Sequence, residues 1–600
     1  MPPREMRLDH GAIGNGSLIA LVNPDSGIDW LCLPRFDSPS IFARIMDEEN
    51  GGTWRFLAGE RPVRGRMKYV RNTNVLLTRF QDGEDVWDVF DFAPRIPAGL
   101  VARAPPRIYR YLVPVKGQPR LTMEFAPRPG YGTVRPQLVP NVLGLELADC
   151  SDPVSLFSNV PAPFIINRRP FILDRPRYFG LCYGTVPERP HLDEIRRDLD
   201  LTIAGWRQWS QAMALHGFAN REVIRSALCL KLHVYEETGA IIAASTTSIP
   251  EALEEPRTWD YRFCWLRDAV FTIEALRRVA HFQEGRNFIL FLRDVALAGP
   301  LQPLYGIGGE RDLHEEELPH LAGFHGTKPV RIGNSAGRQE QHDLMGELVL
   351  CLRTLLMDDR VELHHPKQWF PLVARLVQEA REHAEKPDLG IWEFRGESRH
   401  HTFSKAMCWA ALQHGATLAD FFGEKECAET WEREAHKLRE QILDRAFNTR
   451  LGMFTQVLDG DHADASNLLL PALGLILPQD ERFLSTLDAY RKILVRKNGG
   501  VMRYVHNDDF GAPTNTFTIC SFWWIEALAL AGRLDEAIDT FQAVMAHANS
   551  LGLLSEDIDY RTGMLLGNFP QAYTHVGLIN AASTIGTMLQ AREGRVQSWV

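Results

Sequence analysis

The pattern of hydrophobic and polar positions divides the chain near residue 190. Up to that point, short apolar or alternating runs are separated by Gly, Pro, Asn and Asp, which is typical of strands joined by turns. The clearest runs lie at 17–22, 28–33, 75–81, 108–115 and 120–125. Many short strands with little helical periodicity predict a β-sandwich over residues 1–190.

A helical periodicity replaces this pattern in the rest of the chain. Residues 191–218 predict a linker helix, and residues 219–600 predict helices almost throughout. Twelve helices are expected to begin near Asn220, Asp268, Gln283, Ser335, Lys367, Thr402, Glu424, Asp464, Asp480, Thr516, Leu534 and Gln571. Alternating short and long connections suggest six antiparallel pairs closed into an (α/α)6 barrel, since an open superhelix would show a fixed-period repeat. The expected fold is multidomain, an N-terminal β-sandwich followed by a C-terminal (α/α)6 barrel.

In a closed ring of helix pairs, the long loops gather at one end and build a pocket. The first of these loops, "TWDYRFCWLRDA", places Trp259, Tyr261 and Trp265 close to Arg267 and Asp268. Aromatic rings can stack on the apolar face of a sugar, and a charged pair can hydrogen-bond its hydroxyl groups. The alternative is a helix start with Asp268 as its N-cap and core aromatics behind it.

A second loop, at 320–347, is rich in glycine and then becomes polar. Its side chains Arg331, Asn334, Gln339 and Gln341 could bind hydroxyl groups. The alternative is a turn followed by a solvated helix face. No GK[ST] sequence follows the glycines, so the loop does not predict a phosphate-binding site.

The third loop, "GIWEFRG", seats Glu393 between Trp392 and Phe394. If both rings line the pocket, desolvation disfavours the charged carboxylate and raises its pKa, which suits a general acid. Arg395 would oppose this effect if its side chain pointed inward. The alternative is a loop that merely packs well.

The fourth loop, "GLLSEDIDYRTG", carries Glu556, Asp557 and Asp559 between glycines. It predicts a more polar and wetter setting for Glu556, which suits a general base, although a solvated acidic turn is the alternative. Hydrolysis of a glycosidic bond commonly uses one protonated and one ionised carboxyl group. Glu393 and Glu556 in contrasting environments form the pattern expected of such a pair.

The bulk composition excludes several classes. The net charge is −10 without a dense Lys/Arg block, which argues against nucleic acid or an anionic membrane as a partner. The sequence shows no signal-peptide pattern and no apolar run of the ~18 residues that span a bilayer. Nine scattered cysteines without a CxxC motif favour buried thiols and the cytoplasm. The histidines lack the spacing of a helical metal site, so neither a metal nor a cofactor is expected.

Together these loops resemble the glucoamylase–trehalase family of glycoside hydrolases, family 15, in its bacterial two-domain form. The motifs "WDYRFCWLRDA", "GFHGTKPVRIGN", "GIWEFRG" and "LLSEDID" stand in the order of the family's barrel loops. The segment "IGNGSLIALVNPDSGIDWLCLPRFDSPSIF" resembles the start of its N-terminal β-sandwich. The resemblance runs over most of the chain.

This resemblance implies roles for individual residues. Glu393 matches the family's general acid and Glu556 its general base. Sugar-binding roles are implied for Arg267, Asp268, Trp265, Trp392 and, by a looser alignment, Arg503. The family releases β-glucose from α-glucosides with inversion and without a metal, which implies carboxyl groups ~6.5–9.5 Å apart.

The expected activity is therefore that of an inverting exo-acting α-glucoside hydrolase. We favour α,α-trehalase over a maltooligosaccharide or isomaltose hydrolase, because a cytoplasmic chain without a starch-binding module does not easily reach starch. A disaccharide phosphorylase is the second reading, although the acidic "SEDID" loop would repel phosphate. A non-catalytic sugar-binding protein would have no use for two matched carboxylates. The expected partner is a small α-glucoside; a homo-oligomer, the preferred linkage and the pH optimum stay open.

Overall fold

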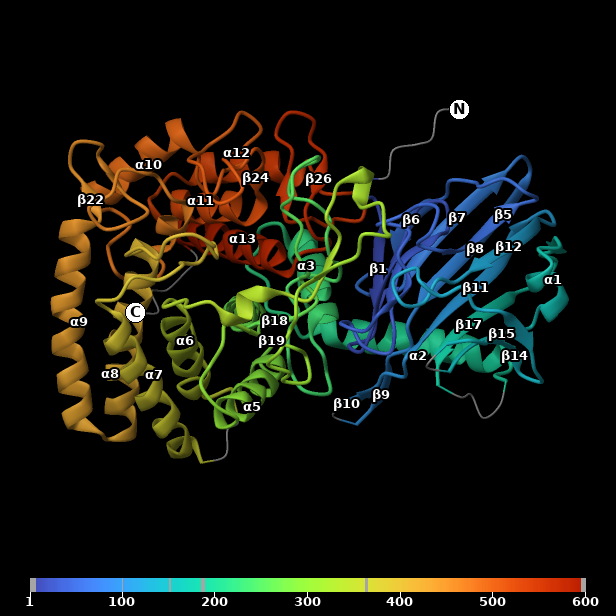
Figure 1. The fold of residues 1–600 in the computed structure, drawn as a ribbon, viewed down its shortest axis with the longest axis horizontal. Helices are drawn as coiled ribbons and strands as arrows, with labels where there is room; N and C mark the ends of the chain where they lie inside the picture. Colours follow the sequence, from blue (N-terminus) through green and yellow to red (C-terminus); the bar gives the residue numbers. More distant parts are fainter. Residues whose placement is uncertain (1–6, 100, 151–152, 185–188, 362–364, 595–600) are drawn as a thin grey trace.

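The computed structural model describes residues 7–99, 101–150, 153–184, 189–361 and 365–594. Strands make up the N-terminal part of the chain and helices most of the remainder, and the two parts lie side by side (Figure 1). The predicted order of a β-sandwich followed by a helical barrel is confirmed.

The first sheet of the sandwich has the strand order β1-β2-β3-β5-β12-β16, with β4 paired to β3. Its strands are β1 (Gly11–Gly14), β2 (Ile19–Val22), β3 (Ile28–Cys32), β4 (Ser40–Phe42), β5 (Thr53–Ala58), β12 (Arg120–Ala126) and β16 (Phe171–Ile172). The paired strands of this sheet run antiparallel.

The second sheet has the order β13-β14-β15-β17-β11-β8-β7-β6. Its strands are β6 (Arg66–Tyr69), β7 (Leu76–Asp82), β8 (Asp85–Phe92), β11 (Arg107–Lys116), β13 (Leu138–Pro140), β14 (Gly144–Leu147), β15 (Val154–Ser158) and β17 (Arg177–Tyr183). A separate hairpin joins β9 (Ile96–Ala98) to β10 (Val101–Arg103).

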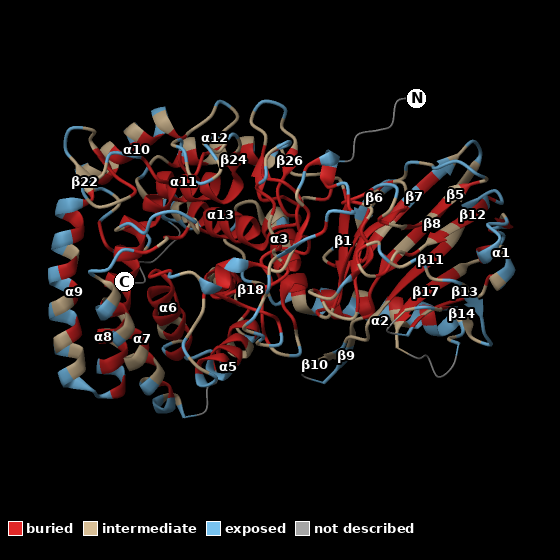
Figure 2. Ribbon diagram, viewed as in Figure 1, coloured by how far each residue is buried: buried red, intermediate tan, exposed pale blue. Residues whose placement is uncertain are grey.

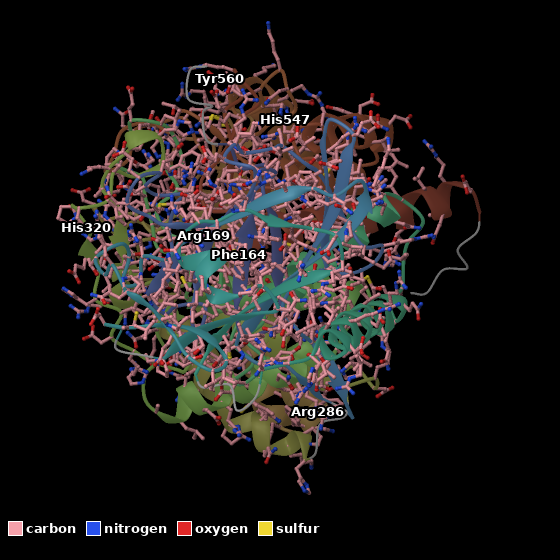
Figure 3. The ribbon with its side chains drawn as sticks, turned by 90° about the vertical axis from the view of Figure 1, so that its right-hand side faces the viewer. Phe164, Arg169, Arg286, His320, His547 and Tyr560 are labelled. Atoms are coloured by element: carbon pink, nitrogen blue, oxygen red, sulfur yellow. The ribbon has the colours of Figure 1, made fainter. Side chains whose placement is uncertain are left out.

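Alternating burial explains why the two sheets stack. Along β7, Leu76 and Phe80 are buried whereas Arg79 is exposed, because successive side chains point to opposite faces. Between the sheets, the rings of Phe56 on β5 and Phe179 on β17 lie 5.1 Å apart. The inner faces therefore share one hydrophobic core. Figure 3 looks onto this end of the molecule, where Phe164 of the short helix α1 (Ala162–Ile166) is seen near the centre.

The barrel begins after α2 (Leu192–Gln211), which follows the sandwich and buries Trp206. Six elements form a closed inner ring in which each packs against the next, and the last packs against the first within the described chain. They are α4 (Leu266–Arg278), α6 (Leu344–Leu356), α8 (Thr402–Phe422), η4 (Ala465–Leu469), α11 (Thr518–Leu530) and α13 (Ala572–Arg592). Because the last element, α13, packs against the first, α4, the ring is closed and is not an open superhelix.

The outer helices cover this ring. They are α3 (Asn220–His233), α5 (Gln283–Leu297), α7 (Phe370–His383), α9 (Lys425–Arg445), α10 (Glu481–Ile493) and α12 (Leu534–Met545). Inner helices such as α11 are buried on nearly every face, whereas α9 exposes most of its surface (Figure 2).

Short strands and 3-10 turns shape the loops between the helices. Two-stranded pairs join β18 (Cys264–Trp265) to β19 (Leu304–Tyr305), β20 (Glu316–Glu317) to β21 (Arg331–Ile332), and β22 (Phe447–Asn448) to β23 (Met453–Phe454). A further sheet has the order β24 (Thr516–Phe517), β25 (Asp557–Ile558) and β26 (Leu565–Leu566). The 3-10 turns are η1 (Phe324–Gly326), η2 (Ser335–Arg338) and η3 (Pro366–Trp369).

Four expected helix starts differ from the structure. At Lys367 the turn η3 forms first, and α7 starts at Phe370. The residue that precedes α4 is Trp265, so Asp268 lies in the first turn and is not the N-cap. At Ser335 only the turn η2 forms, and the helix itself starts at Leu344. At Asp464 only η4 forms, because Pro471 lacks the N–H donor that a continuing helix requires.

The sandwich and the barrel are held together by buried polar contacts. The indole Nε1 of Trp30 donates to the carbonyl of Ser245 at 2.7 Å. The guanidinium of Arg262, in the barrel loop that carries Tyr261, donates to the hydroxyl of Tyr131 at 2.9 Å. The sandwich therefore supports a loop of the barrel from behind.

Candidate active site

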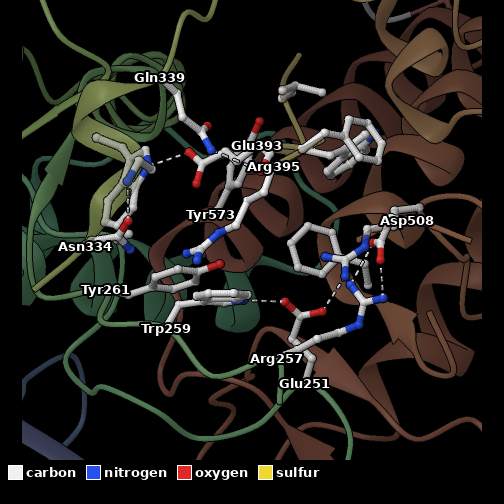
Figure 4. A pocket seen from close by; sticks show the side chains of 18 of the residues that line it. Glu251, Arg257, Trp259, Tyr261, Asn334, Gln339, Glu393, Arg395, Asp508 and Tyr573 are labelled. Atoms are coloured by element: carbon white, nitrogen blue, oxygen red, sulfur yellow. Dashed lines mark hydrogen bonds and ion pairs between the residues drawn. The ribbon is translucent and has the colours of Figure 1, made fainter. Parts of the chain in front are cut away.

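The loops at one end of the barrel form a pocket (Figure 4). Ten of the residues that the sequence predicts for the site line it: Trp259, Tyr261, Trp265, Arg267, Asp268, Asn334, Gln339, Trp392, Glu393 and Arg503. Three further predicted residues, Arg331, Gln341 and Glu556, are buried and do not line it. The structure thus brings together side chains from loops that are more than 200 residues apart in sequence.

Glu393 is presented by a tight turn. Its backbone has φ = +59°, a left-handed conformation that residues other than glycine rarely adopt. Gly390, with φ = +67°, makes the turn possible, since its carbonyl accepts from the Glu393 N–H at 3.1 Å. A strained backbone held by its surroundings is common where a side chain must be aimed at a site.

Three donors meet on one oxygen of the Glu393 carboxyl group. Its Oε1 accepts hydrogen bonds from the indole Nε1 of Trp265 at 2.7 Å, from Nη2 of Arg267 at 3.2 Å and from Nε2 of Gln341 at 3.2 Å. The side chain of Glu393 keeps about a fifth of its surface exposed, at 22%. The carboxyl group is therefore positioned by polar contacts and still faces the pocket.

Trp392 and Phe394 both line the pocket, but the apolar surroundings expected for the Glu393 carboxyl are replaced by polar donors. The indole of Trp392 donates to Asp464 at 2.9 Å, and the ring of Phe394 stacks on His401 with centroids 5.4 Å apart. Both rings have partners other than the Glu393 carboxyl, because the turn rotates neighbouring side chains in different directions. The surroundings of Glu393 are polar and include a guanidinium.

Arg267 and Asp268 form a buried part of the pocket wall. Both lie in the first turn of α4 and are more than nine-tenths buried. Nη1 of Arg267 donates to Oε1 of Gln341 at 3.0 Å, and Nε lies 3.6 Å from Asp268. Burial raises the pKa of Asp268 to about 6, although the charge of Arg267 acts in the opposite direction. This pair can offer both donors and acceptors to a ligand.

Glu556 stands in a setting opposite to the expected one. It is fully buried, and its Oε2 accepts from the backbone N–H of Asn568 at 3.1 Å. The loop that carries Glu556 continues into strand β25 of the three-stranded sheet. Gly567 packs so closely against Glu556 that a Cβ added to the glycine would lie 2.5 Å from the Cβ of Glu556. The prediction of a wetter loop is therefore wrong.

Burial also governs the proton affinity of Glu556. Burial, and after it the negative charge of Glu251, raise the pKa of Glu556 to about 8. Tyr261 faces Glu556 and its hydroxyl counteracts the rise, while Oε1 makes no hydrogen bond of ordinary geometry within the described chain. Since Tyr261 also lines the pocket, it connects Glu556 to the pocket wall.

Glu251 is a lining residue that the sequence reasoning missed. Its Oε1 accepts from the indole Nε1 of Trp259 at 3.0 Å, and its Oε2 pairs with the guanidinium of Arg503. It also lies near Glu556, so it joins three of the predicted residues. Its local sequence, "SIPEAL", contains no signal for this role.

A second missed pair closes the outer wall. Arg257 donates to both carboxylate oxygens of Asp508 at 2.7 and 2.8 Å, and both residues line the pocket. Asp508 follows "VMRYVH", the segment that contains Arg503, and its position in a turn with Phe510 is the one local hint. Bidentate geometry of this kind orients a loop firmly.

The guanidinium groups of Arg331 and Arg395 both lie against the ring of Trp259. Arg331 lies 5.0 Å from the Trp259 ring and donates to the carbonyls of Pro256 and Thr258, so it supports the loop from behind. Arg395 lies 4.6 Å over the ring from the pocket side and pairs with Glu315. Arg395 therefore lines the pocket, and the carboxylate that it pairs with is Glu315.

Asn334 lines the pocket but is also engaged with the backbone. Its Oδ1 accepts from the N–H of Ala336 at 2.9 Å, and its Nδ2 donates to the carbonyl of Asp260 at 3.3 Å.

Within the described ranges, no helix is long and apolar enough to cross a membrane. Those ranges also contain no group of three or more His, Cys, Asp or Glu side chains placed to hold a metal ion.

Comparison with protein families covers most of the chain. Residues 217–583 match the family described as Glycosyl hydrolases family 15. Residues 6–164 match the domain described as Trehalase-like, N-terminal. The first match includes the pocket, and the second lies within the sandwich.

Full-length relatives show the same correspondence. The trehalases of Mycolicibacterium smegmatis and Mycobacterium tuberculosis are both 34% identical over 96% of this chain, which corresponds to 90% and 88% of their own lengths. A trehalase of Thermoplasma volcanium is 31% identical over 98% of this chain and 95% of its own.

A solved structure shares the arrangement of both parts. A bacterial glucoamylase in complex with acarbose aligns with a TM-score of 0.70 at 14% identity, covering 98% of this chain and 96% of the other. At that identity the match concerns the fold. Taken with the family match over more than half of the chain, it leads to one conclusion: the chain belongs to glycosyl hydrolases family 15 and is a glycoside hydrolase.

Proposed function

We propose that this glycoside hydrolase is an α,α-trehalase that acts with inversion. The observation that carries the proposal is the carboxyl of Glu393 in the wall of a pocket that the buried pair Arg267 and Asp268 also line. The full-length relatives that bear the name trehalase support the choice of substrate.

Glu393 is assigned the role of general acid and Glu556 that of general base. The acid gives its proton to the glycosidic oxygen, and the base activates a water molecule on the other face of the sugar. In the free enzyme, burial gives Glu556 the raised pKa, whereas Glu393 receives a hydrogen bond from Arg267. Glu556 must lose its proton before it can activate the water molecule.

The remaining lining residues are assigned to sugar recognition. Arg267 and Asp268 would bind hydroxyl groups of the inner glucose, and the ring of Trp265 would pack against its apolar face. Trp259, Tyr261, Asn334, Trp392 and Arg503 would line the rest of the site. Arg331, which the sequence also predicts, would act only through Trp259.

The cytoplasm is the proposed location. Seven of the nine cysteines, all within the described chain, are buried as free thiols, and burial raises the pKa of several of them, such as Cys229 and Cys264. Thiols kept in this form suit a reducing compartment. A small intracellular α-glucoside such as trehalose is the matching substrate.

A substrate panel tests the proposal. Purified enzyme is given trehalose, maltose, isomaltose and kojibiose, with and without phosphate, and free glucose is measured. We expect trehalose to give the highest kcat/KM and glucose release without phosphate. A preference for maltose or isomaltose would contradict the trehalase assignment, and strict dependence on phosphate with release of a glucose phosphate would indicate a phosphorylase.

The stereochemistry is followed by NMR during the first turnovers. Inversion predicts one α- and one β-glucose from each trehalose, the β-anomer coming from the attacked sugar. Two α-glucose molecules appearing first would contradict inversion.

A further inference from the structure

Two buried carboxyl groups on α6 lie behind the active site without a counter-charge of their own. Asp343 directly precedes α6 and Glu347 lies four residues later in its first turn, so their side chains share one face of the helix. Both are 1% exposed. Neither lines the pocket, and the proposed reaction does not use them.

No residue outside the pair donates a hydrogen bond of ordinary geometry to these carboxyl oxygens within the described chain, whereas the two side chains lie within hydrogen-bonding reach of each other. This absence of an outside donor holds for Oδ1 and Oδ2 of Asp343 and for Oε1 and Oε2 of Glu347. The cation nearest to them is Arg267, whose Nη1 lies 3.8 Å from Oδ2 of Asp343. Within the same ranges, Glu347 forms no ion pair.

The other groups around the pair do not supply the missing charge. The titratable groups that face it are Arg267 and Asp268 on α4, Cys408 on α8, Tyr573 on α13, and Asp388 and Glu393 of the loop between α7 and α8. Arg267 is the one cation among them. It already donates to Glu393 and lies beside Asp268. Ionising Asp343 and Glu347 together would bury two further negative charges against one shared cation.

We propose that Glu347 keeps its proton at neutral pH and donates it to Asp343, so that one negative charge, and not two, lies behind the guanidinium of Arg267. Two carboxyl groups at one buried site cannot both ionise cheaply, and sharing a proton gives each of them a partner. Burial and the charge of Asp343 both raise the pKa of Glu347, in agreement with this arrangement. Glu347 is then a positioning residue that acts through Arg267.

The arrangement has a consequence for the site. Arg267 is held from behind by a single anion at 3.8 Å, a distance that leaves both of its Nη atoms free to donate to Gln341 and Glu393 on the pocket side. A second anion would pull the guanidinium away from Glu393. The protonated state of Glu347 therefore sets how strongly Arg267 engages the catalytic carboxyl.

Infrared spectroscopy tests the proton directly and does not depend on activity. Spectra of the wild type and of Glu347→Gln are recorded at pH 7 and subtracted. We expect the variant to lose intensity in the carbonyl stretch of protonated carboxylic acids. Loss of carboxylate intensity would show that Glu347 is ionised and would overturn the proposal. Glu340→Gln, the same change at an exposed glutamate nearby, is the matched control and should leave the acid band unchanged.

Kinetics test the positioning role, and this arm rests on the proposed function. Glu347→Ala removes the donor to Asp343 and should lower kcat/KM for trehalose by about tenfold or more, because a buried acceptor loses its partner. Glu347→Gln retains a neutral N–H donor and should recover most of that loss. Equal losses in the two variants would overturn the proposal. If the wild type does not cleave trehalose, the proposed function is wrong. The infrared spectra still determine whether Glu347 is protonated.

Discussion

The indole Nε1 of Trp265 donates a 2.7 Å hydrogen bond to Oε1 of Glu393, a residue 128 positions further along the chain. Arg267 and Gln341 donate to the same oxygen, so the three donors fix the carboxyl group in one orientation. A carboxyl that must deliver a proton to a defined oxygen requires such positioning.

Trp265→Phe should weaken catalysis without disturbing the fold. The ring is kept, and only the N–H donor to Glu393 is lost. One charge-assisted hydrogen bond is worth about 1.5–3 kcal/mol, which corresponds to a loss of roughly tenfold to a hundredfold in kcat if it is made in the transition state. Steady-state kinetics with trehalose measure the effect. An unchanged kcat would show that this contact does not orient the acid.

Glu393→Gln should separate substrates by their leaving groups. We expect a loss of about 10²–10⁴ on trehalose, whose leaving oxygen needs a proton, and a much smaller loss on α-glucosyl fluoride. Comparison of the two kcat/KM values checks the assignment. Equal losses on both substrates would argue that Glu393 is not the acid.

Glu556→Gln should abolish turnover of both substrates, since a neutral amide cannot activate water. Sugar binding, measured by calorimetry with glucose, should survive. Asp559→Asn in the same loop is the matched control, because Asp559 bonds Thr562 and lies outside the pocket. The opposite result would be a Glu556→Gln variant that still hydrolyses α-glucosyl fluoride and a Glu393→Gln variant that does not. It would show that Glu556 is the general acid and Glu393 the general base.

The dependence of kcat/KM on pH should report on Glu556. It reflects groups of the free enzyme, and the pKa of Glu556 is raised to about 8, first by burial and then by the charge of Glu251. The value seen in the profile is a property of the coupled groups. Because a neighbouring negative charge raises the pKa of an acid, its removal in Glu251→Gln should lower that pKa. The limb that titrates near pH 8 should therefore move to lower pH, and a limb that stays in place would contradict the coupling.

Arg262→Ala should destabilise the protein. The guanidinium is 1% exposed, donates to both oxygens of Asp260 at 2.9 and 2.6 Å, and reaches Tyr131 of the sandwich. Its removal leaves Asp260 as a buried unpaired charge, at a cost of about 3–5 kcal/mol. Urea denaturation followed by tryptophan fluorescence measures the loss. The double variant Arg262→Met with Asp260→Asn should recover part of it, whereas a further loss would contradict this cause.

Local patterns predicted much of this fold. The alternating runs of the N-terminal part all became strands, and helices at Asn220, Gln283, Thr402 and Leu534 begin at the predicted residues. Asp480 is the N-cap of α10, as predicted for a short polar residue before an apolar run. Its side chain accepts a hydrogen bond from the N–H of Arg482 at 2.9 Å. These features depend on residues close in sequence.

The sequence predicted which residues belong to the site, but it did not predict what surrounds the two carboxyl groups. The motifs identified ten lining residues, yet the assigned surroundings of Glu393 and Glu556 were reversed. The reason is that neighbours in sequence were taken for neighbours in space. Phe394 turns toward His401, while the donors to Glu393 come from segments at 265–267 and 341.

The sequence by itself determined the fold class, the family and the side chains available for chemistry, because periodicity and motif order are local properties. Only the tertiary structure decided which carboxyl is buried and which meets a guanidinium. A pKa depends on charges and solvent within a few ångströms, and at Glu556 those charges belong to Glu251, about 300 residues earlier in the chain.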